Sequence, residues 1–429
     1  MAKTKISEWS STPASNSDID GINLAEGMVP SDVNNAIREM MSQIKDLQSA
    51  NGTYYTADSD AIAIGAGGTG AITAATARTN LGLAIGTDVQ AYNAELQGIS
   101  QGGNSCFKNR IINGAMVIDQ RNAGASVAND VTGAQYSLDR WNIYGNFASK
   151  FTVQQNAGSV TPPVGFKNYL GATSSAATTV GATDSYIILQ KIEGFNTADL
   201  AWGTANAAAV TLSFRVYSSL TGTFGGSITN SAENRSYPFT YSIPVANTWT
   251  TISITIAGDT SGTWLTTNGT GMKVVFSLGT GTTFSGTAGA WAATIYYSAT
   301  GATSVVGTNG ATFYITGVQL EKGSTATSFD YRPYGTELSL CQRYCLPIAS
   351  GFRGDAIITN FYGQIESFFM RAAPTVLTAT TLTGSNNFAA VATGDVSQIT
   401  ATSALVQKAA SATGANGIFS GSYLLAAEL

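Results

Sequence analysis

The side chains that could carry out chemistry are few in this chain. It contains no histidine, so it lacks the side chain best suited to proton transfer near neutral pH, and Ser-His-Asp and Cys-His catalysis are excluded. Paired carboxylates can still cleave a glycosidic bond when they lie about 5–9 Å apart. The candidates are Asp184, Glu193, Asp199, Glu233 and Asp259. Because the sequence brings no two of them together, we expect no enzyme, with glycoside hydrolysis as the alternative.

Cysteines and glycines also suggest chemistry at first sight. Cys106, Cys341 and Cys345 are too few, and odd in number, for a disulfide framework. Cys341 and Cys345 have no histidine or third ligand nearby, so we predict structural thiols rather than a metal site. The glycine-rich run 65–70 resembles a phosphate-binding loop, but it lacks the Gly-Lys-Ser/Thr ending and an acidic ribose partner. We expect no cofactor and no metal.

Aromatic residues are candidates for binding rather than catalysis. Several lie in Gly- or Thr-rich, turn-like sequence, where an aromatic ring can pack on the apolar C–H face of a sugar. The candidate glycan contacts are Trp202, Tyr237, Trp249, Trp264 and Trp291. The alternative for each is core packing, because tryptophan is usually mostly buried.

The composition limits the kinds of partner. Of 429 residues, 11% are charged and 44% are hydrophobic, which favours dense β-structure over solvated helices. A net charge of −5 without a long basic run argues against nucleic acid and anionic membrane surfaces. No apolar stretch is long enough for a membrane span, and the first residues do not resemble a signal peptide. We therefore expect synthesis in a cytoplasm and no membrane insertion.

The first hundred residues predict an anchor, a stalk and a linker. Residues 1–30 are polar and extended, and their scattered apolar side chains could become ordered on a partner; these are Trp9, Ile19, Ile22 and Leu24. Residues 31–50 indicate a helix with a heptad seam of Val33, Ile37, Met40, Ile44 and Leu47. We favour a parallel bundle over a helix packed on its own chain. Residues 51–105, rich in Gly, Ala and Thr, predict a shaft or linker with short helices at 73–81 and 89–96.

The remaining residues are predicted to be mainly β. Short β-branched or aromatic segments separated by turns indicate a jelly roll or β-sandwich over residues 106–345. The strands expected there are 111–112, 186–189, 210–217, 250–256, 273–278, 293–297 and 312–315. A short helix is expected over 335–344. Residues 346–429 predict a smaller β domain with strands at 357–358, 364–370, 375–379 and 423–426.

Two local motifs are predicted to be structural. The sequence Tyr331-Arg332-Pro333-Tyr334 is expected to clamp the sandwich to the following helix. Asp139-Arg140-Trp141 predicts a buried tryptophan with a nearby ion pair.

As a set, several motifs resemble those of tailed-bacteriophage tail fibres. The N-terminal attachment region of such fibres is similar to residues 20–27 and 33–41, and the shaft is similar to residues 67–70, 77–83 and 86–92. A carbohydrate-binding-like module of phage structural proteins is similar to residues 109–114, 139–141, 319–323, 329–338 and 341–344. Residues 370–375 recur in the terminal part of the same family.

The resemblance implies a mainly β virion protein that projects from a phage tail. Residues 1–30 would attach to the tail adaptor or nozzle, residues 31–50 would form a trimeric coiled coil, and residues 51–105 would form the shaft. The sandwich at 106–345 and the β domain at 346–429 would bind a host-surface receptor, a glycan or a protein. The alternatives are a head-attached fibre or decoration protein, and a capsular polysaccharide depolymerase.

Overall fold

The computed structural model divides the chain into two compact units, residues 1–93 and residues 94–429. It describes residues 8–10, 12, 15–24, 29–50, 71, 73–83, 107–133, 135–356, 361–381, 396–409 and 414–429. Within 45–50, 349–356, 361–366, 378–381, 406–409 and 414–422, and at 397, the backbone alone is described. None of the described helices is long and apolar enough to cross a membrane.

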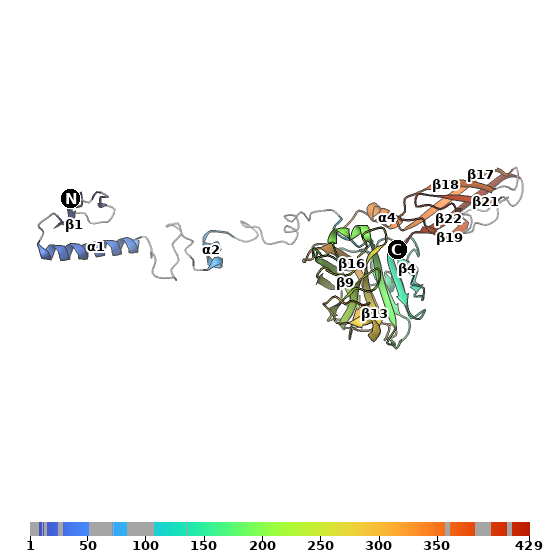
Figure 1. Cartoon of the computed structure of the whole chain (residues 1–429), viewed down its shortest axis with the longest axis horizontal. Helices are drawn as coiled ribbons and strands as arrows, with labels where there is room; N and C mark the ends of the chain where they lie inside the picture. Colours follow the sequence, from blue (N-terminus) through green and yellow to red (C-terminus); the bar gives the residue numbers. More distant parts are fainter. Residues whose placement is uncertain are drawn as a thin grey trace. The chain divides into compact units, whose positions relative to one another are not determined.

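A sandwich of two six-stranded sheets dominates the second unit (Figure 1). The first sheet has the order β11 (Ser236–Ile243), β10 (Gly222–Asn230), β13 (Thr270–Thr280), β8 (Ser185–Glu193), β5 (Trp141–Gly145), β4 (Gln135–Leu138). The second has the order β12 (Thr250–Ile256), β9 (Val210–Ser218), β16 (Thr312–Lys322), β7 (Leu170–Ser174), β6 (Phe151–Gln155), β3 (Val127–Ala128). The ladders in both sheets are antiparallel.

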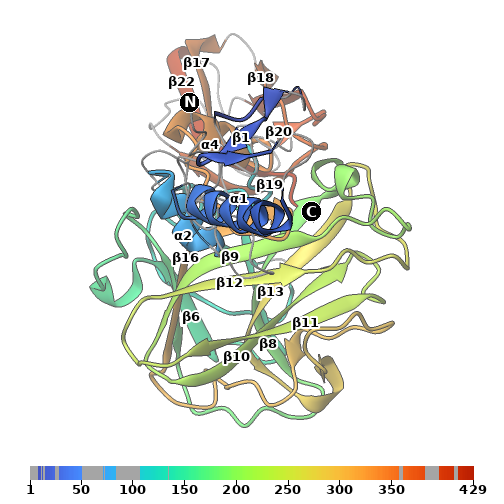
Figure 2. The ribbon, with the colours of Figure 1, turned by 90° about the vertical axis from the view of Figure 1, so that its left-hand side faces the viewer.

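The core of the sandwich lies between these sheets, whose strands cross the body of the molecule in Figure 2. Phe214 of β9 meets Phe276 of β13 edge to face, with ring centroids 5.1 Å apart, so the two sheets pack face to face. Trp141 is fully buried and its indole nitrogen donates to the carbonyl of Asn113 at 3.1 Å. The prediction of a mainly β chain containing a β-sandwich is therefore confirmed.

Two short strands lie outside the two large sheets and pair with each other. β14 (Ser285–Gly286) and β15 (Ser298–Ala299) pair in parallel. Between them, residues 293–297 form no strand; the isolated bridge from Ser236 ends at Ala292, just before this segment. Residues 111–112 are also not a strand but part of a turn segment. Both strand predictions are wrong.

Two three-stranded sheets follow the sandwich. α4 (Tyr334–Gln342) leads into the order β17 (Cys345–Ala356), β22 (Gly414–Ala426), β19 (Thr375–Thr381) and the order β18 (Phe361–Ser367), β21 (Ser403–Ala409), β20 (Val396–Ser397). Predicted strands at 375–379 and 423–426 lie within β19 and β22, and 364–370 overlaps β18. Residues 357–358 lie outside the described residues.

The C-terminal residues are held on the sandwich by buried charges. The carboxylate of Glu428 pairs with Arg121 at 2.7 Å and also with Arg140, whose side chain is 1% exposed. The guanidinium of Arg140 lies 3.6 Å from the ring centroid of Tyr344. The ion pair expected near Trp141 therefore exists, but its acid comes from the other end of the chain rather than from Asp139, which accepts hydrogen bonds from Gln120.

In the first unit, helix α1 (Pro30–Ala50) packs on a short hairpin of β1 (Asp18–Ile19) and β2 (Ile22–Asn23). Ile19 and Ala36 are buried, and the indole nitrogen of Trp9 donates to the side-chain oxygen of Gln43 at 3.1 Å. Over its described residues, the segment 1–30 thus packs on α1 of its own chain. A second short helix, α2 (Ala74–Asn80), matches the helix predicted at 73–81, whereas 89–96 lies outside the described residues.

Replacing Glu428 by Gln should destabilise the second unit, because it leaves the buried Arg140 guanidinium without its counter-charge. We expect the free energy of unfolding to fall by about 3 kcal/mol, measured by urea denaturation with tryptophan fluorescence. Glu233→Gln is the matched control: the Glu233 side chain is 41% exposed in its pair with Lys273, and its loss should cost less than about 1 kcal/mol. Equal losses in the two variants would contradict this account.

Candidate functional site

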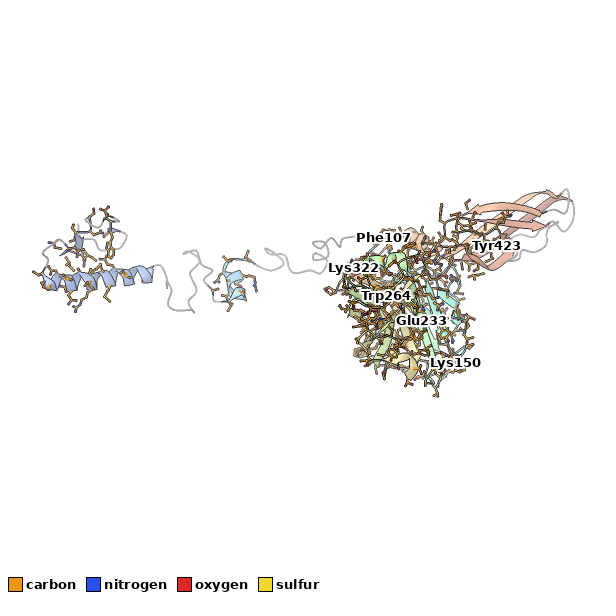
Figure 3. All side chains as sticks on the ribbon, in the orientation of Figure 1. Phe107, Lys150, Glu233, Trp264, Lys322 and Tyr423 are labelled. Atoms are coloured by element: carbon orange, nitrogen blue, oxygen red, sulfur yellow. The ribbon has the colours of Figure 1, made fainter. Side chains whose placement is uncertain are left out.

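Four of the five predicted glycan contacts gather in one aromatic cluster. The ring centroid of Trp202 lies 4.7 Å from that of Trp264 and 5.3 Å from that of Trp291, and Tyr237 lies 5.2 Å from Trp291. Trp202, Trp264 and Tyr237 are buried and belong to the core of the sandwich; Trp264 is labelled in Figure 3. Their ring faces are therefore occupied by one another, and only Trp291 is partly exposed.

Hydrogen bonds also fix this cluster in a structural role. The indole nitrogens of Trp202 and Trp291 donate to backbone carbonyls at 2.7 and 2.9 Å. The indole of Trp264 donates to Asp259, which also holds Arg235 through two hydrogen bonds of 2.6 and 2.8 Å. With their indole nitrogens paired within the chain, the three tryptophans have no donor left to offer a sugar hydroxyl.

The fifth predicted contact, Trp249, lies elsewhere, in an aromatic row across the second sheet. Its ring centroid is 5.5 Å from Tyr217 of β9, and Tyr217 stacks on Tyr314 of β16 at 5.3 Å with an interplanar angle of 4°. Tyr169 stacks on Tyr314 at 5.1 Å. Tyr169 and Tyr314 are buried, whereas Tyr217 and Trp249 are half-exposed, so the row opens to solvent at its β9–β12 end.

A polar row lies next to the aromatic row on the same face. Arg215 of β9 is directly opposite Thr251 of β12 and Thr316 of β16 in the strand register. Ser253 and Ser213 form the next pair along the two strands. Because side chains two residues apart share a face, this outer face carries hydroxyls and one guanidinium roughly 7 Å from the aromatic row.

The segment 156–169 walls one side of this face. Its carbonyls accept from the Trp249 indole (Thr161, 2.9 Å), the Thr316 hydroxyl (Asn168, 2.7 Å) and the Tyr169 hydroxyl (Ala157, 2.5 Å). Burial raises the pKa of Tyr169 and of Tyr314, so both phenols stay protonated and neutral. The β16 part of the face is thus closed, and the β9–β12 part remains open.

Each carboxylate named as a hydrolytic candidate has a partner in the chain. Asp199 pairs with Arg110, Glu233 with Lys273, Asp259 with Arg235, Glu193 with Arg343, and Asp184 accepts from the amide of Gly181. The partners come from different parts of the sandwich, and no interaction links two of these five acids. Among the described residues, no group of three or more His, Cys, Asp and Glu side chains could hold a metal ion.

The motif Tyr331–Tyr334 does clamp the sandwich to α4. The Arg332 guanidinium donates to the carbonyls of Asn109 and Ile111 and to the carboxylate of Glu337, which lies in the first turn of α4. The tyrosines do not stack on Arg332; Tyr331 packs on Phe166 instead. A cavity of about 100 Å³ lies beside the clamp.

The seam predicted on α1 is exposed in the single chain. Val33, Ile37 and Ile44 are 41%, 48% and 53% exposed. Met40 is half-buried, and the Leu47 side chain is outside the described side chains. Of the predicted anchor residues, Ile19 is buried, while Trp9, Ile22 and Leu24 are half-buried. The glycine-rich run 65–70 and Cys106 lie outside the described residues.

Comparisons with known proteins add little to these contacts. No family model and no curated protein matches the sequence. Among solved structures, the chain is similar to TmCBM61 in complex with β-1,4-galactotriose (10% identity, 44% of this chain and 91% of that chain, TM-score 0.24). It is also similar to a family 11 carbohydrate-binding module from Clostridium thermocellum (13%, 47% and 98%, 0.24) and a xylan-binding domain from Paenibacillus barcinonensis (9%, 48% and 99%, 0.22). These likenesses are too remote to carry a functional argument.

Cys341 and Cys345 should be inert in the folded protein. Both are fully buried, and burial raises the pKa of Cys345 to about 12 and raises that of Cys341 as well, so neither is a thiolate at pH 8. Iodoacetamide labelling followed by peptide mass spectrometry should leave both unmodified in the native state and modify both after denaturation. Rapid native labelling of either would contradict the structural role.

Proposed function

We propose that this chain is a homotrimeric tail fibre of a tailed-phage virion, assembled in the host cytoplasm, that binds a host-surface glycan. Residues 1–30 attach it to the tail adaptor, and the β-sandwich carries the binding site. The observation that carries the binding proposal is the open β9–β12 face, where half-exposed Tyr217 and Trp249 lie beside the row of Arg215 and Thr251.

This face has the two features that sugar recognition needs. Aromatic rings pack on the apolar C–H face of a sugar, and side-chain hydroxyls and a guanidinium hydrogen-bond its oxygens. The exposed side chains of Thr251 and Ser253 on β12 and the half-exposed Arg215 can supply those hydrogen bonds. We propose binding rather than hydrolysis, because the candidate acids are each engaged by a partner of their own.

The trimer is supported by the two faces of α1. One face, with Ala36 and Gln43 buried, packs on the N-terminal hairpin. The seam formed by Val33, Ile37 and Ile44 has no cover in its own chain, among the residues described. Apolar side chains alternating four and three apart are covered when parallel helices pack knobs into holes. Two further copies of the same chain would supply that cover.

Removing the open aromatic rings should weaken glycan binding. Trp249→Ala combined with Tyr217→Ala should lower affinity for the bound glycan roughly tenfold, measured on a glycan array and then by calorimetry with the best-bound member. Phe195→Ala is the control, because Phe195 is 61% exposed and lies off this sheet face. Circular dichroism should match wild type. Unchanged binding by the double variant, or no glycan bound by the wild type, would contradict the proposed site.

The seam predicts the oligomeric state. The full chain should be a trimer by light scattering, and Ile37→Asp should shift it to monomer, since a charge at the seam opposes close packing of three helices. Asn35→Asp adds the same charge at an exposed position off the seam and should leave the trimer intact. A monomeric wild type, or a trimeric Ile37→Asp variant, would count against the stalk.

A further inference from the structure

Arg215 on the open β9–β12 face carries a positive charge, which the binding of a neutral glycan does not require. It lies in the middle of β9, flanked in register by Thr251 and Thr316. Its side chain is half-buried. It makes no hydrogen bond or ion pair with any residue that the structure describes. Its neighbours on this face carry hydroxyls and aromatic rings, and none of them holds a negative charge.

The other arginines of the second unit whose side chains the structure describes are all engaged. Carboxylates pair with Arg110, Arg121, Arg140, Arg235, Arg332 and Arg343, and backbone carbonyls accept from Arg371. The chain has an excess of acids over bases, 26 to 21, so acidic partners are not scarce. Arg215 stands apart from this pattern: it is partly withdrawn from water and is given no counter-charge.

The chemistry of the group points to what it would bind. A guanidinium presents a planar fork of donors that matches a carboxylate with two parallel hydrogen bonds. Withdrawing such a charge from water is unfavourable unless an anion compensates it. Tyr217 lies two residues along β9 on the same face, roughly 7 Å away, and Trp249 extends its ring surface. A sugar ring on the aromatic row would place a ring carboxylate near Arg215.

We propose that the open β9–β12 face selects an acidic saccharide, with the carboxylate of a uronic or sialic acid on Arg215 and the sugar ring on Tyr217 and Trp249. This inference rests on the proposed glycan-binding function and specifies its ligand class. Thr251 and Ser253 then hydrogen-bond the neighbouring hydroxyls. Neutral glycans use the same aromatic row but lose the charged contact.

The test compares matched glycans on the full chain. An array would carry uronic-acid and sialic-acid oligosaccharides beside their neutral counterparts, such as oligogalacturonate with galactose oligomers, hyaluronan with its carboxyl-reduced form, and sialyllactose with lactose. The variants are Arg215→Met, which removes the charge and keeps much of the apolar stem, and Arg215→Lys, which keeps the charge without the fork. Lys322→Met is the control, since it removes one charge from a 49% exposed lysine on β16 of the same sheet.

We expect the acidic member of at least one pair to bind about tenfold more tightly than its neutral partner. Arg215→Met should abolish that preference, Arg215→Lys should retain part of it, and Lys322→Met should keep it. Equal binding of acidic and neutral members, or a preference that survives Arg215→Met, overturns the inference while leaving glycan binding in place. Binding to no glycan at all overturns both, which separates the two failures.

Discussion

Side chains alternate between the two faces of a β-strand, and in β9 this constraint sets both the core and the candidate site. Leu212, Phe214 and Val216 face inward and are fully buried, so Arg215 and Tyr217 must face outward. A slip of one residue in the pairing would exchange the two sets. The proposed binding face therefore exists only when the strand is in the register that fills the core, so the same pairing that builds the core also positions the candidate site.

Part of this fold could be predicted from the sequence because some strands are rich in β-branched residues. The residues of β12 read TTISITI, and the predicted range 250–256 matches its observed bounds. β10 was missed because it reads GTFGGSITN, and three glycines are rare in a strand. The structure explains the glycines: a Cβ at Gly226 would meet the Phe239 ring at 2.6 Å, so close packing requires their absence. Close packing between residues on different strands leaves no local sequence pattern from which the strand could be predicted.

The same distinction governs the candidate site. Residue type and a Gly- or Thr-rich context selected the aromatics, and neither could distinguish buried rings from exposed ones. Trp202 and Trp264, for example, pack on each other in the core. Trp249 lies just before β12 and stays half-exposed beside Tyr217. The alternation of β9 could have drawn attention to Tyr217 and Arg215 before the fold was known. No local signal could have shown that Arg215 lacks a carboxylate, or that Glu428 neutralises Arg140 instead, because those partners are decided by topology.

The exposed seam of α1 and the open β9–β12 face are linked by the energetics of binding. Two half-exposed rings and one guanidinium offer few contacts, and much of what they gain is offset by the freedom lost on association. A single copy is therefore expected to release a glycan quickly. In the proposed trimer, linkage turns the second and third contacts into intramolecular ones, with effective concentrations up to the millimolar range. A weak, selective face is useful on a fibre only if the stalk multiplies it, and a trimeric stalk gains adhesive value only from such a face.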